Sequence, residues 1–422
     1  MHRQIPLRFK DRSYYGSINP EHLCLSYTVR PCDLSQRRFK NMLLAEPSID
    51  LLNYEFKTVF DWIDISVTTL ASHIKVNLHR QLNKLNETHH AFRSCFVSTP
   101  TRERWVPGRE FIIRMQDPQP KGLRSLLRAL LISHCSRGTE LNEIPVTGLE
   151  LSLDVYPARN KGFGPEEHGL QRMLMTELLR KHISVSDAFR GGRRRPRFTF
   201  LHGSTAKTDL TLEVPSTMKS WIRKEKRSTG IGAQDLAARL PEAHRQPFID
   251  ATFYFGQKDE RLHYRCMDKL TDNRTERDAD LLPSVQTRSR IELTYKDEKP
   301  GDRLGPASSD IESIDEIASR GLKRFNTLLL FELPVFNPDK SNPLKPDDDE
   351  WEVFSRTGVA GLAHKSDVDA YCTKDRAALR AFNRREVTSS GKFVRYKEFN
   401  RRLSRALKRL QDRWEEDWGL SM

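Results

Sequence analysis

The sequence predicts an α+β protein in which a central, largely antiparallel sheet is covered by helices and followed by a basic helical C-terminal region. Three observations support this prediction. Residues 146–156 alternate strictly between apolar and polar side chains, as a half-buried strand does. Leucines in residues 123–131 recur at helical spacing. Residues 392–413 combine nine Lys and Arg residues with one apolar stripe, so one helix face packs and the other is cationic.

The other elements follow from the same two periodicities. Residues 59–68 predict a central strand, and Ile74, Leu78 and Leu82 then predict a helix laid on the sheet. Pro165, followed by two glutamates, predicts the start of another helix. Further strands are predicted at residues 111–115, 198–201, 210–214, 251–255, 263–267 and 290–295.

Changes in composition predict four parts along the chain. Residues 1–54 are polar and irregular, and we expect a poorly ordered or accessory arm. Residues 55–300 hold the alternating strands and helices of an α/β domain. Residues 301–350 are rich in linker residues, with one helix and one strand, and residues 351–422 form the basic helical C-terminal region.

Charge favours a polyanionic partner. The 422-residue chain has 71 Lys and Arg against 57 Asp and Glu, a net charge of +14. Nucleic acid is the first candidate partner and acidic lipid the second. No apolar run approaches the ~20 residues of a membrane helix, and the N-terminus lacks an apolar secretory core. The six cysteines show no CxxC spacing, which argues against a zinc ribbon or a disulfide scaffold. We therefore expect a cytoplasmic protein.

Basic residues concentrate in three segments. Residues 190–197 have the sequence RGGRRRPR, residues 219–227 have the sequence KSWIRKEKR, and the third segment is the C-terminal helix. Phosphate contact is one interpretation of these segments, and a solvated basic surface is the other. The residues expected to contact DNA are Arg190, Arg193, Arg194, Arg195, Arg197, Arg223, Lys224, Arg401, Arg405 and Lys408.

Carboxylates stand at regular places in the predicted strands. Glu150 and Asp154 share one face of a strand, and Glu292 lies on a later strand. Carboxylates on neighbouring strands can hold a divalent metal through hard oxygen ligands, as phosphodiester chemistry requires. The alternative is that they are ordinary solvent-facing residues. The motifs GxxxxGK[ST], GxSxG and HExxH are absent, which argues against an ATPase and common hydrolases.

The order of these segments resembles a known family, the replication initiators of small rolling-circle plasmids and filamentous phages (the Rep_trans class). Members show an FDWxxxT/V strand, an LDLxxD strand, a YFGxxxSxxxxRxYxK hairpin and an RxExEL strand. The corresponding places here are residues 60–67, Glu150 with Asp154, residues 254–269 and residues 288–293.

This resemblance implies a DNA replication initiator of a mobile element, which binds an origin and nicks one strand by metal-dependent tyrosine transesterification. Residues 55–300 would be the initiator domain. Glu150, Asp154 and Glu292 would hold Mg²⁺ or Mn²⁺, and Arg265 and Lys269 would grip the scissile phosphate. The implied partners are origin DNA, double- and single-stranded, with a host helicase as a further candidate.

Two residues depart from the family pattern. Met267 stands at the place of the nucleophilic tyrosine, and Arg290 at the first acid of RxExEL. Tyr264 is the nucleophile we name first, although a regular strand turns it away from position 267; Tyr254 and Tyr295 are the other candidates. Met267 also supports an alternative, a non-catalytic sequence-specific DNA-binding or regulatory protein. An RNA-binding protein ranks last, because no aromatic-rich stacking strand is evident.

Overall fold

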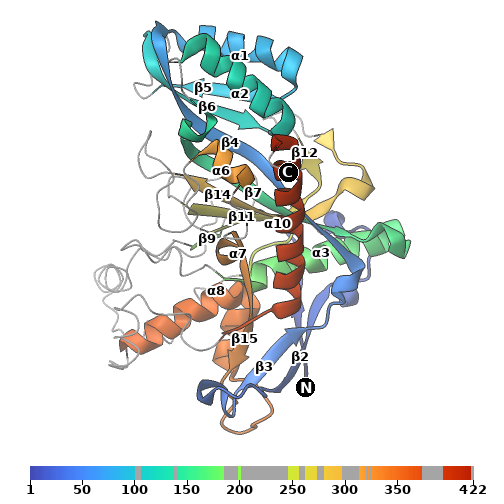
Figure 1. The fold of residues 1–422 in the computed structure, drawn as a ribbon. Coiled ribbons are helices and arrows are strands. Elements are labelled where there is room, and N and C mark those ends of the chain that lie inside the picture. The colour runs from blue at the N-terminus through green and yellow to red at the C-terminus, as the bar shows by residue number, and fades with distance from the viewer. Residues whose placement is uncertain are drawn as a thin grey trace.

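The computed structural model describes residues 1–99, 106–135, 140–184, 198–200, 246–255, 262–272, 280–296, 313–319, 322, 325–372 and 393–419. Over these residues the chain forms an eight-stranded sheet, a six-stranded sheet and a two-stranded ribbon, and every strand pair is antiparallel. Helices pack against the sheets (Figure 1). The α+β prediction is confirmed.

The eight-stranded sheet carries the candidate site. Its strands in spatial order are β5 (Ser94–Ser98), β6 (Gly108–Gln116), β4 (Tyr54–His73), β7 (Val146–Pro157), β14 (Arg288–Lys296), β11 (Leu262–Lys269), β10 (Phe253–Phe255) and β9 (Phe198–Phe200). The predicted strands therefore lie side by side in one sheet, except that residues 210–214 are outside the described residues.

Two helices begin at a proline. Pro120 and Pro165 occupy the first turn of α2 and α3. A backbone N–H in this turn has no acceptor within the helix, so proline, which has no N–H, costs no hydrogen bond there. The helices are α1 (Lys75–His89), α2 (Pro120–His134), α3 (Pro165–His182), α6 (Ile314–Ser319), α7 (Phe325–Leu328), α8 (Asp348–Cys372) and α10 (Lys397–Trp418). Short 3₁₀ helices span Arg12–Tyr15, Pro20–His22, Arg37–Phe39, Leu51–Asn53, Leu141–Glu143, Arg159–Lys161 and Ser284–Gln286. None of the described helices combines the length and apolar character required to cross a membrane.

Residues 1–54 form strands and 3₁₀ helices, which does not fit the poorly ordered one of the two arms considered for this segment. Leu25, Tyr27 and Val29 are buried and alternate with more exposed residues, as in a strand that has one face covered by the core. Strand β3 pairs with β15, so residues 1–54 and 301–350 contribute strands to the same sheet. The strands of this sheet are β1 (His2–Pro6), β2 (Cys24–Pro31), β3 (Leu43–Pro47), β15 (Leu330–Phe336), β16 (Phe393–Arg395) and β8 (Ile183–Ser184). The ribbon pairs β12 (Thr271–Asp272) with β13 (Asp280–Leu281).

Helix α10 joins the two sheets. It contacts β4, α2 and β15 of the smaller sheet (red in Figure 1). Its apolar stripe packs on the apolar face of the large sheet, with the Trp414 ring 5.3 Å from that of Phe60. Thr58 Oγ1 donates to the carbonyl of Ala406 at 3.0 Å. The predicted packing face of the C-terminal helix is therefore the face that meets the sheet.

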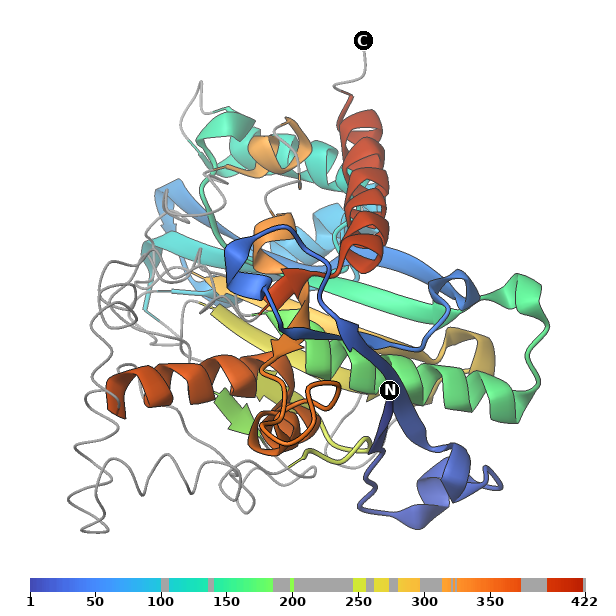
Figure 2. The same cartoon turned by 90° about the horizontal axis from the view of Figure 1, so that it is seen from below.

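Helix α3 lies beneath the same sheet face and packs against α8 (Figure 2). Gly358 of α8 has φ +72°, a left-handed conformation that favours glycine. A Cβ atom added there would lie 2.5 Å from the carbonyl oxygen of Lys181. This glycine lets the two helices approach closely.

Candidate active site and basic cleft

The face of the large sheet opposite α10 is lined with charged side chains. On β7, Leu149, Leu151 and Leu153 point to the helices, so Glu150, Ser152 and Asp154 point the other way. Residues paired across antiparallel strands share a face. The pairs Arg290–Asp154, Glu292–Ser152 and Arg265–Glu292 therefore bring charges from β14, β11 and β7 together.

A β-bulge in β4 adds a carboxylate to this face. Phe60 pairs with Leu151 and Trp62 pairs with Glu150, so Asp61 is an extra residue in the register, with no residue of β7 directly opposite it. The bulge changes the alternation of the strand, and Asp61 and Asp64 consequently point to the same face. Asp61 accepts a hydrogen bond from Ser152, and Asp64 pairs with Arg114 at 2.6 Å.

Three carboxylates converge as a result: Asp61, Glu150 and Glu292. One oxygen from each lies within 4.8 Å of the others. Glu150 and Glu292 are two of the predicted metal ligands. Asp154, the third, is not in this group, and Asp61 takes its place. Asp61 is the acid of the segment Phe60-Asp61-Trp62, which matches the FDW motif of the family. The match to this motif was the sequence signal that could have identified Asp61 as a candidate ligand.

Asp154 is held by arginines instead. Arg290 donates from Nε to Oδ1 at 2.5 Å and from Nη2 to Oδ2 at 2.7 Å, and Arg288 Nε lies 3.0 Å from Oδ1. Burial alone would raise the pKa of Asp154, but the two guanidinium groups outweigh it and hold that pKa below its usual value. The predicted role of Asp154 as a metal ligand does not fit this arrangement.

Arginines also contact the three-carboxylate cluster. Arg265 Nη2 lies 2.5 Å from Glu292 and 3.2 Å from Glu150, and Arg290 Nη1 lies 3.1 Å from Asp61. These cations do not fully offset the negative charge. Burial, with Glu150 and Asp61 nearby, raises the pKa of Glu292 to about 7 against the opposing effect of Arg265. Burial likewise raises the pKa of Asp61, with Arg290 opposing it.

The cluster suits a hard divalent cation. Its donors are carboxylate oxygens, the ligands that Mg²⁺ and Mn²⁺ prefer. Glu292 Oε2 is buried and lies 2.5 Å from Arg265 Nη2. A buried carboxylate whose pKa is raised despite this contact, and which lies near two other carboxylates, would gain from a bound cation.

The candidate tyrosines lie on different faces. Tyr264 is buried in the core, where its hydroxyl donates to the carbonyl of Leu328 at 2.7 Å, and burial raises its pKa well above the usual value. Tyr295 is also buried on that side. Neither hydroxyl is presented to the carboxylates, so the choice of Tyr264 as nucleophile does not fit the geometry. Tyr254 is half-buried and pairs with Arg265, which places it on the cluster face.

Met267 and Lys269 of β11 lie on the sheet face that carries the three carboxylates. Met267 pairs with Arg290, so the residue at the family's tyrosine position does face the cluster. Lys269 lies further along and pairs with Asp272 at 3.0 Å. Of the two predicted phosphate-gripping residues, Arg265 contacts the carboxylates and Lys269 lies toward a neighbouring cleft.

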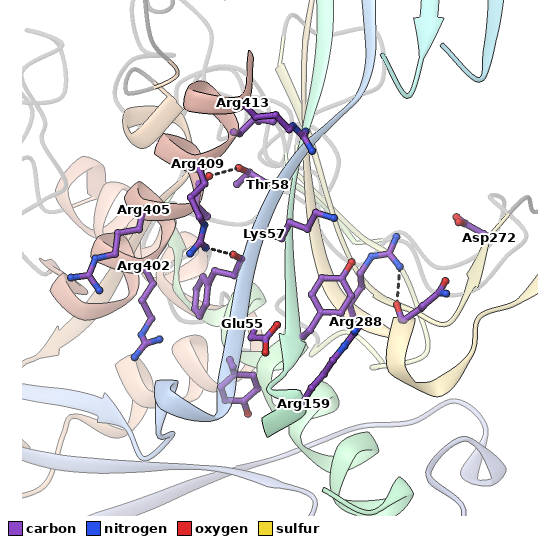
Figure 3. A pocket seen from close by; sticks show the side chains of 16 residues that line it. Glu55, Lys57, Thr58, Arg159, Asp272, Arg288, Arg402, Arg405, Arg409 and Arg413 are labelled. Atoms are coloured by element: carbon purple, nitrogen blue, oxygen red, sulfur yellow. Dashed lines mark hydrogen bonds between the residues drawn. The ribbon is translucent and has the colours of Figure 1, made fainter. Parts of the chain in front are cut away.

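That cleft has a volume of about 1020 Å³ and is strongly basic (Figure 3). It crosses β4 at residues 55–58, with α10 on one side and β7, β14 and Asp272 on the other. Glu55 and Asp272 are its acidic residues among those described. Its cationic lining consists of Lys57, Arg159, Arg288, Arg402, Arg405, Arg409 and Arg413.

The predicted DNA contacts divide into three groups. Arg405 lines the basic cleft. Arg401 and Lys408 lie elsewhere on α10, where they pair with Glu398 at 2.6 Å and Asp412 at 3.1 Å. Lys57 and Arg159 also line the cleft and were not predicted, because neither belongs to one of the three basic segments. The remaining predicted contacts lie outside the described residues: Arg190, Arg193, Arg194, Arg195, Arg197, Arg223 and Lys224.

No protein-family model matches the chain, and no curated protein matches it. A structure of the rolling circle replication initiator protein from Geobacillus stearothermophilus is similar in part. The two sequences are 12% identical, and the similarity covers 58% of this chain and 75% of that one, with a TM-score of 0.21.

Proposed function

We propose that this protein is a DNA replication initiator of a mobile element, such as a plasmid, phage or integrative element, and that it nicks and rejoins one strand at the origin. The observation that carries the proposal is the convergence of Asp61, Glu150 and Glu292 within 4.8 Å on three neighbouring strands. The basic cleft beside the cluster and the net charge of +14 support a nucleic-acid substrate.

Each group has a defined role in the proposal. Asp61, Glu150 and Glu292 hold Mg²⁺ or Mn²⁺, which supplies Lewis-acid stabilisation of the phosphate charge when bound. Arg265 contacts two of these ligands and also lies where it can orient a phosphate. Tyr254 is the nucleophile, because among Tyr254, Tyr264 and Tyr295 it is the one on the carboxylate face.

The proposed step is a transesterification. The phenolic oxygen of Tyr254 attacks phosphorus and forms an O–P bond, while the bond from phosphorus to the 3′ oxygen breaks. The phenol gives up one proton and the departing 3′ oxygen takes one up. No water is consumed, so the phosphodiester is conserved as a link to the 5′ end and the reverse reaction rejoins the strand.

A second function is favoured by a specific observation. Arg290 binds Asp61 and Asp154 and lies 3.5 Å from Glu292, so it supplies positive charge in the place where a cation would act. On this alternative the protein binds origin DNA without cutting it.

The two functions are separated by incubating the protein with supercoiled DNA that carries its origin, in the presence of Mg²⁺, Mn²⁺ or EDTA. Nicking predicts relaxed circles with protein joined to a 5′ end, lost with EDTA and in Glu150→Gln. Asp64→Asn is the matched control, because Asp64 pairs with Arg114 on the same sheet face outside the cluster. If no metal produces a covalent product while DNA binding persists, the non-catalytic function holds.

A further inference from the structure

The basic cleft has two banks that flank one strand edge. Strand β6 pairs with β4 only from Trp62 onward, so residues 55–60 have β7 along one edge and α10 near the other. Arg409 donates to the carbonyl of Phe56 at 2.7 Å and so occupies part of that edge. Arg405 and Arg413 extend the bank on α10 (Figure 3).

The opposite bank joins the cleft to the carboxylate cluster. Arg288 lines the cleft and binds Asp154, and Asp154 binds Arg290, which in turn contacts Asp61. A chain of ion pairs therefore runs along the sheet face from the cleft to the cluster. A DNA strand bound in the cleft would therefore lie beside this chain of ion pairs, which leads to the three carboxylates.

The cleft also offers an aromatic surface. Tyr156 lines it half-buried, with the guanidinium of Arg288 5.7 Å from its ring centre. Its hydroxyl lies 3.4 Å from Asp154, which anchors the ring. Cationic side chains interleaved with an aromatic ring are the usual means by which proteins hold unpaired bases.

We propose that this cleft binds single-stranded DNA, with backbone phosphates between the α10 bank and the Arg159–Arg288 bank and a base stacked on Tyr156. The proposal deepens the proposed function and rests on DNA being the substrate. A single strand is favoured over a duplex because the cleft is concave, is cationic on both sides and carries a stacking surface. A duplex exposes its phosphates on a convex outer surface and keeps its bases stacked on one another.

The test measures fluorescence anisotropy of a labelled thymidine oligonucleotide of roughly 16 nucleotides, the upper range of such sites. EDTA is present throughout, so no metal or nicking is required. Arg405→Ala with Arg413→Ala should weaken binding roughly 10-fold or more and reduce the salt dependence by about 0.7 per lost phosphate contact. Arg395→Ala with Lys397→Ala is the matched control, because both residues are exposed and neither lines the cleft.

Stacking is tested separately with Tyr156. Tyr156→Phe keeps the ring and should bind like the wild type, whereas Tyr156→Ala should lose roughly 10-fold in affinity. Circular dichroism and thermal melting establish that each variant is folded.

Three outcomes overturn the proposal: unchanged affinity and salt dependence in the Arg405/Arg413 variant, an equal loss in the Arg395/Lys397 variant, or tighter binding of a duplex of the same length. Because binding is measured in EDTA, a protein that binds through the cleft but never nicks contradicts the nicking function alone.

Discussion

Arg290 grips Asp154 through two parallel hydrogen bonds, from Nε at 2.5 Å and from Nη2 at 2.7 Å. This bidentate pair is buried, with 7% and 2% of the two side chains exposed. The pair removes Asp154 from the group of oxygens that converge on β4, β7 and β14. It also fixes the guanidinium where Nη1 meets Asp61, so one arginine joins two carboxylates.

Burial, together with the local charge balance, explains the raised pKa of Glu292. Asp61, Glu150, Asp154 and Glu292 contribute four acids, and Arg265, Arg288 and Arg290 contribute three cations that contact them. Burial strengthens the effect of the uncompensated acid. A bound divalent cation would compensate it.

Replacing Arg290 should therefore expose the cluster to metal. Arg290→Met leaves buried carboxylates without their cation, and we expect the free energy of unfolding to fall by about 3 kcal/mol. Mn²⁺ or Mg²⁺ should then raise the melting temperature of this variant more than that of the wild type, because the metal replaces the lost positive charge. Urea unfolding and melting curves with metal or EDTA measure both effects.

Arg114→Met is the control for that experiment. Arg114 lies on the same sheet face and pairs with Asp64, which is not part of the cluster. Its loss should lower stability without increasing the response to metal. Equal metal-induced shifts in the two variants would contradict a cation site at the cluster.

Stability should depend on pH through Glu292. Its pKa is about 7 in the folded protein, above the ordinary value of 4.5. Between those values Glu292 binds more protons in the folded state than in the unfolded state, so its contribution to the free energy of unfolding falls as pH rises from about 4.5 to 7. Asp61, whose pKa is also raised, acts in the same direction. Asp154 acts in the opposite direction and below its ordinary value of 3.8.

Glu292→Gln tests this dependence, because the amide does not titrate. Burial lowers the pKa of His182 to about 4, which makes stability rise with pH in the same range, so the two proteins have to be compared. From pH 5 to 7 the urea midpoint of the wild type should fall relative to that of the variant. Parallel curves for the two proteins would show that another group titrates in this range.

Periodicity was sufficient to predict the strands that build the site. Each strand of residues 146–156 and 290–295 has one apolar face, so its register and the direction of Glu150 and Glu292 follow from alternation. The same rule predicted that Tyr264 faces away from position 267. The structure confirms this: Tyr264 is in the core and Met267 faces the cluster.

Asp61 and Asp154 could not be assigned in this way. The bulge at Asp61 is defined by pairing between β4 and β7, and strict alternation gives no sign of it. Asp154 points to the predicted face, but its partners come from β14, 134 residues or more along the chain. Which carboxylates meet a metal and which meet an arginine is decided by side chains that only tertiary structure brings together.

The approach of α8 to α3 depends on Gly358. An alanine there would need φ near +72° and would place its Cβ 2.5 Å from the carbonyl oxygen of Lys181. We expect Gly358→Ala to lower the free energy of unfolding by more than about 2 kcal/mol. Gly169→Ala is the control: it lies inside α3 with its nearest atom 3.9 Å away, so it should be neutral or slightly stabilising. Urea unfolding distinguishes them, and a neutral Gly358→Ala would contradict the close contact.

The tyrosines offer the sharpest test of the chemistry. Tyr254→Phe should abolish the covalent link to the 5′ end of nicked DNA, because its hydroxyl is the candidate on the carboxylate face. Tyr264→Phe should leave the link intact and cost about 1 kcal/mol of stability, since it removes the hydrogen bond to Leu328. The adduct is measured by denaturing electrophoresis of labelled DNA, and stability by urea unfolding. An adduct that survives Tyr254→Phe and disappears in Tyr264→Phe would require β11 to rearrange so that its buried face turns toward the carboxylates.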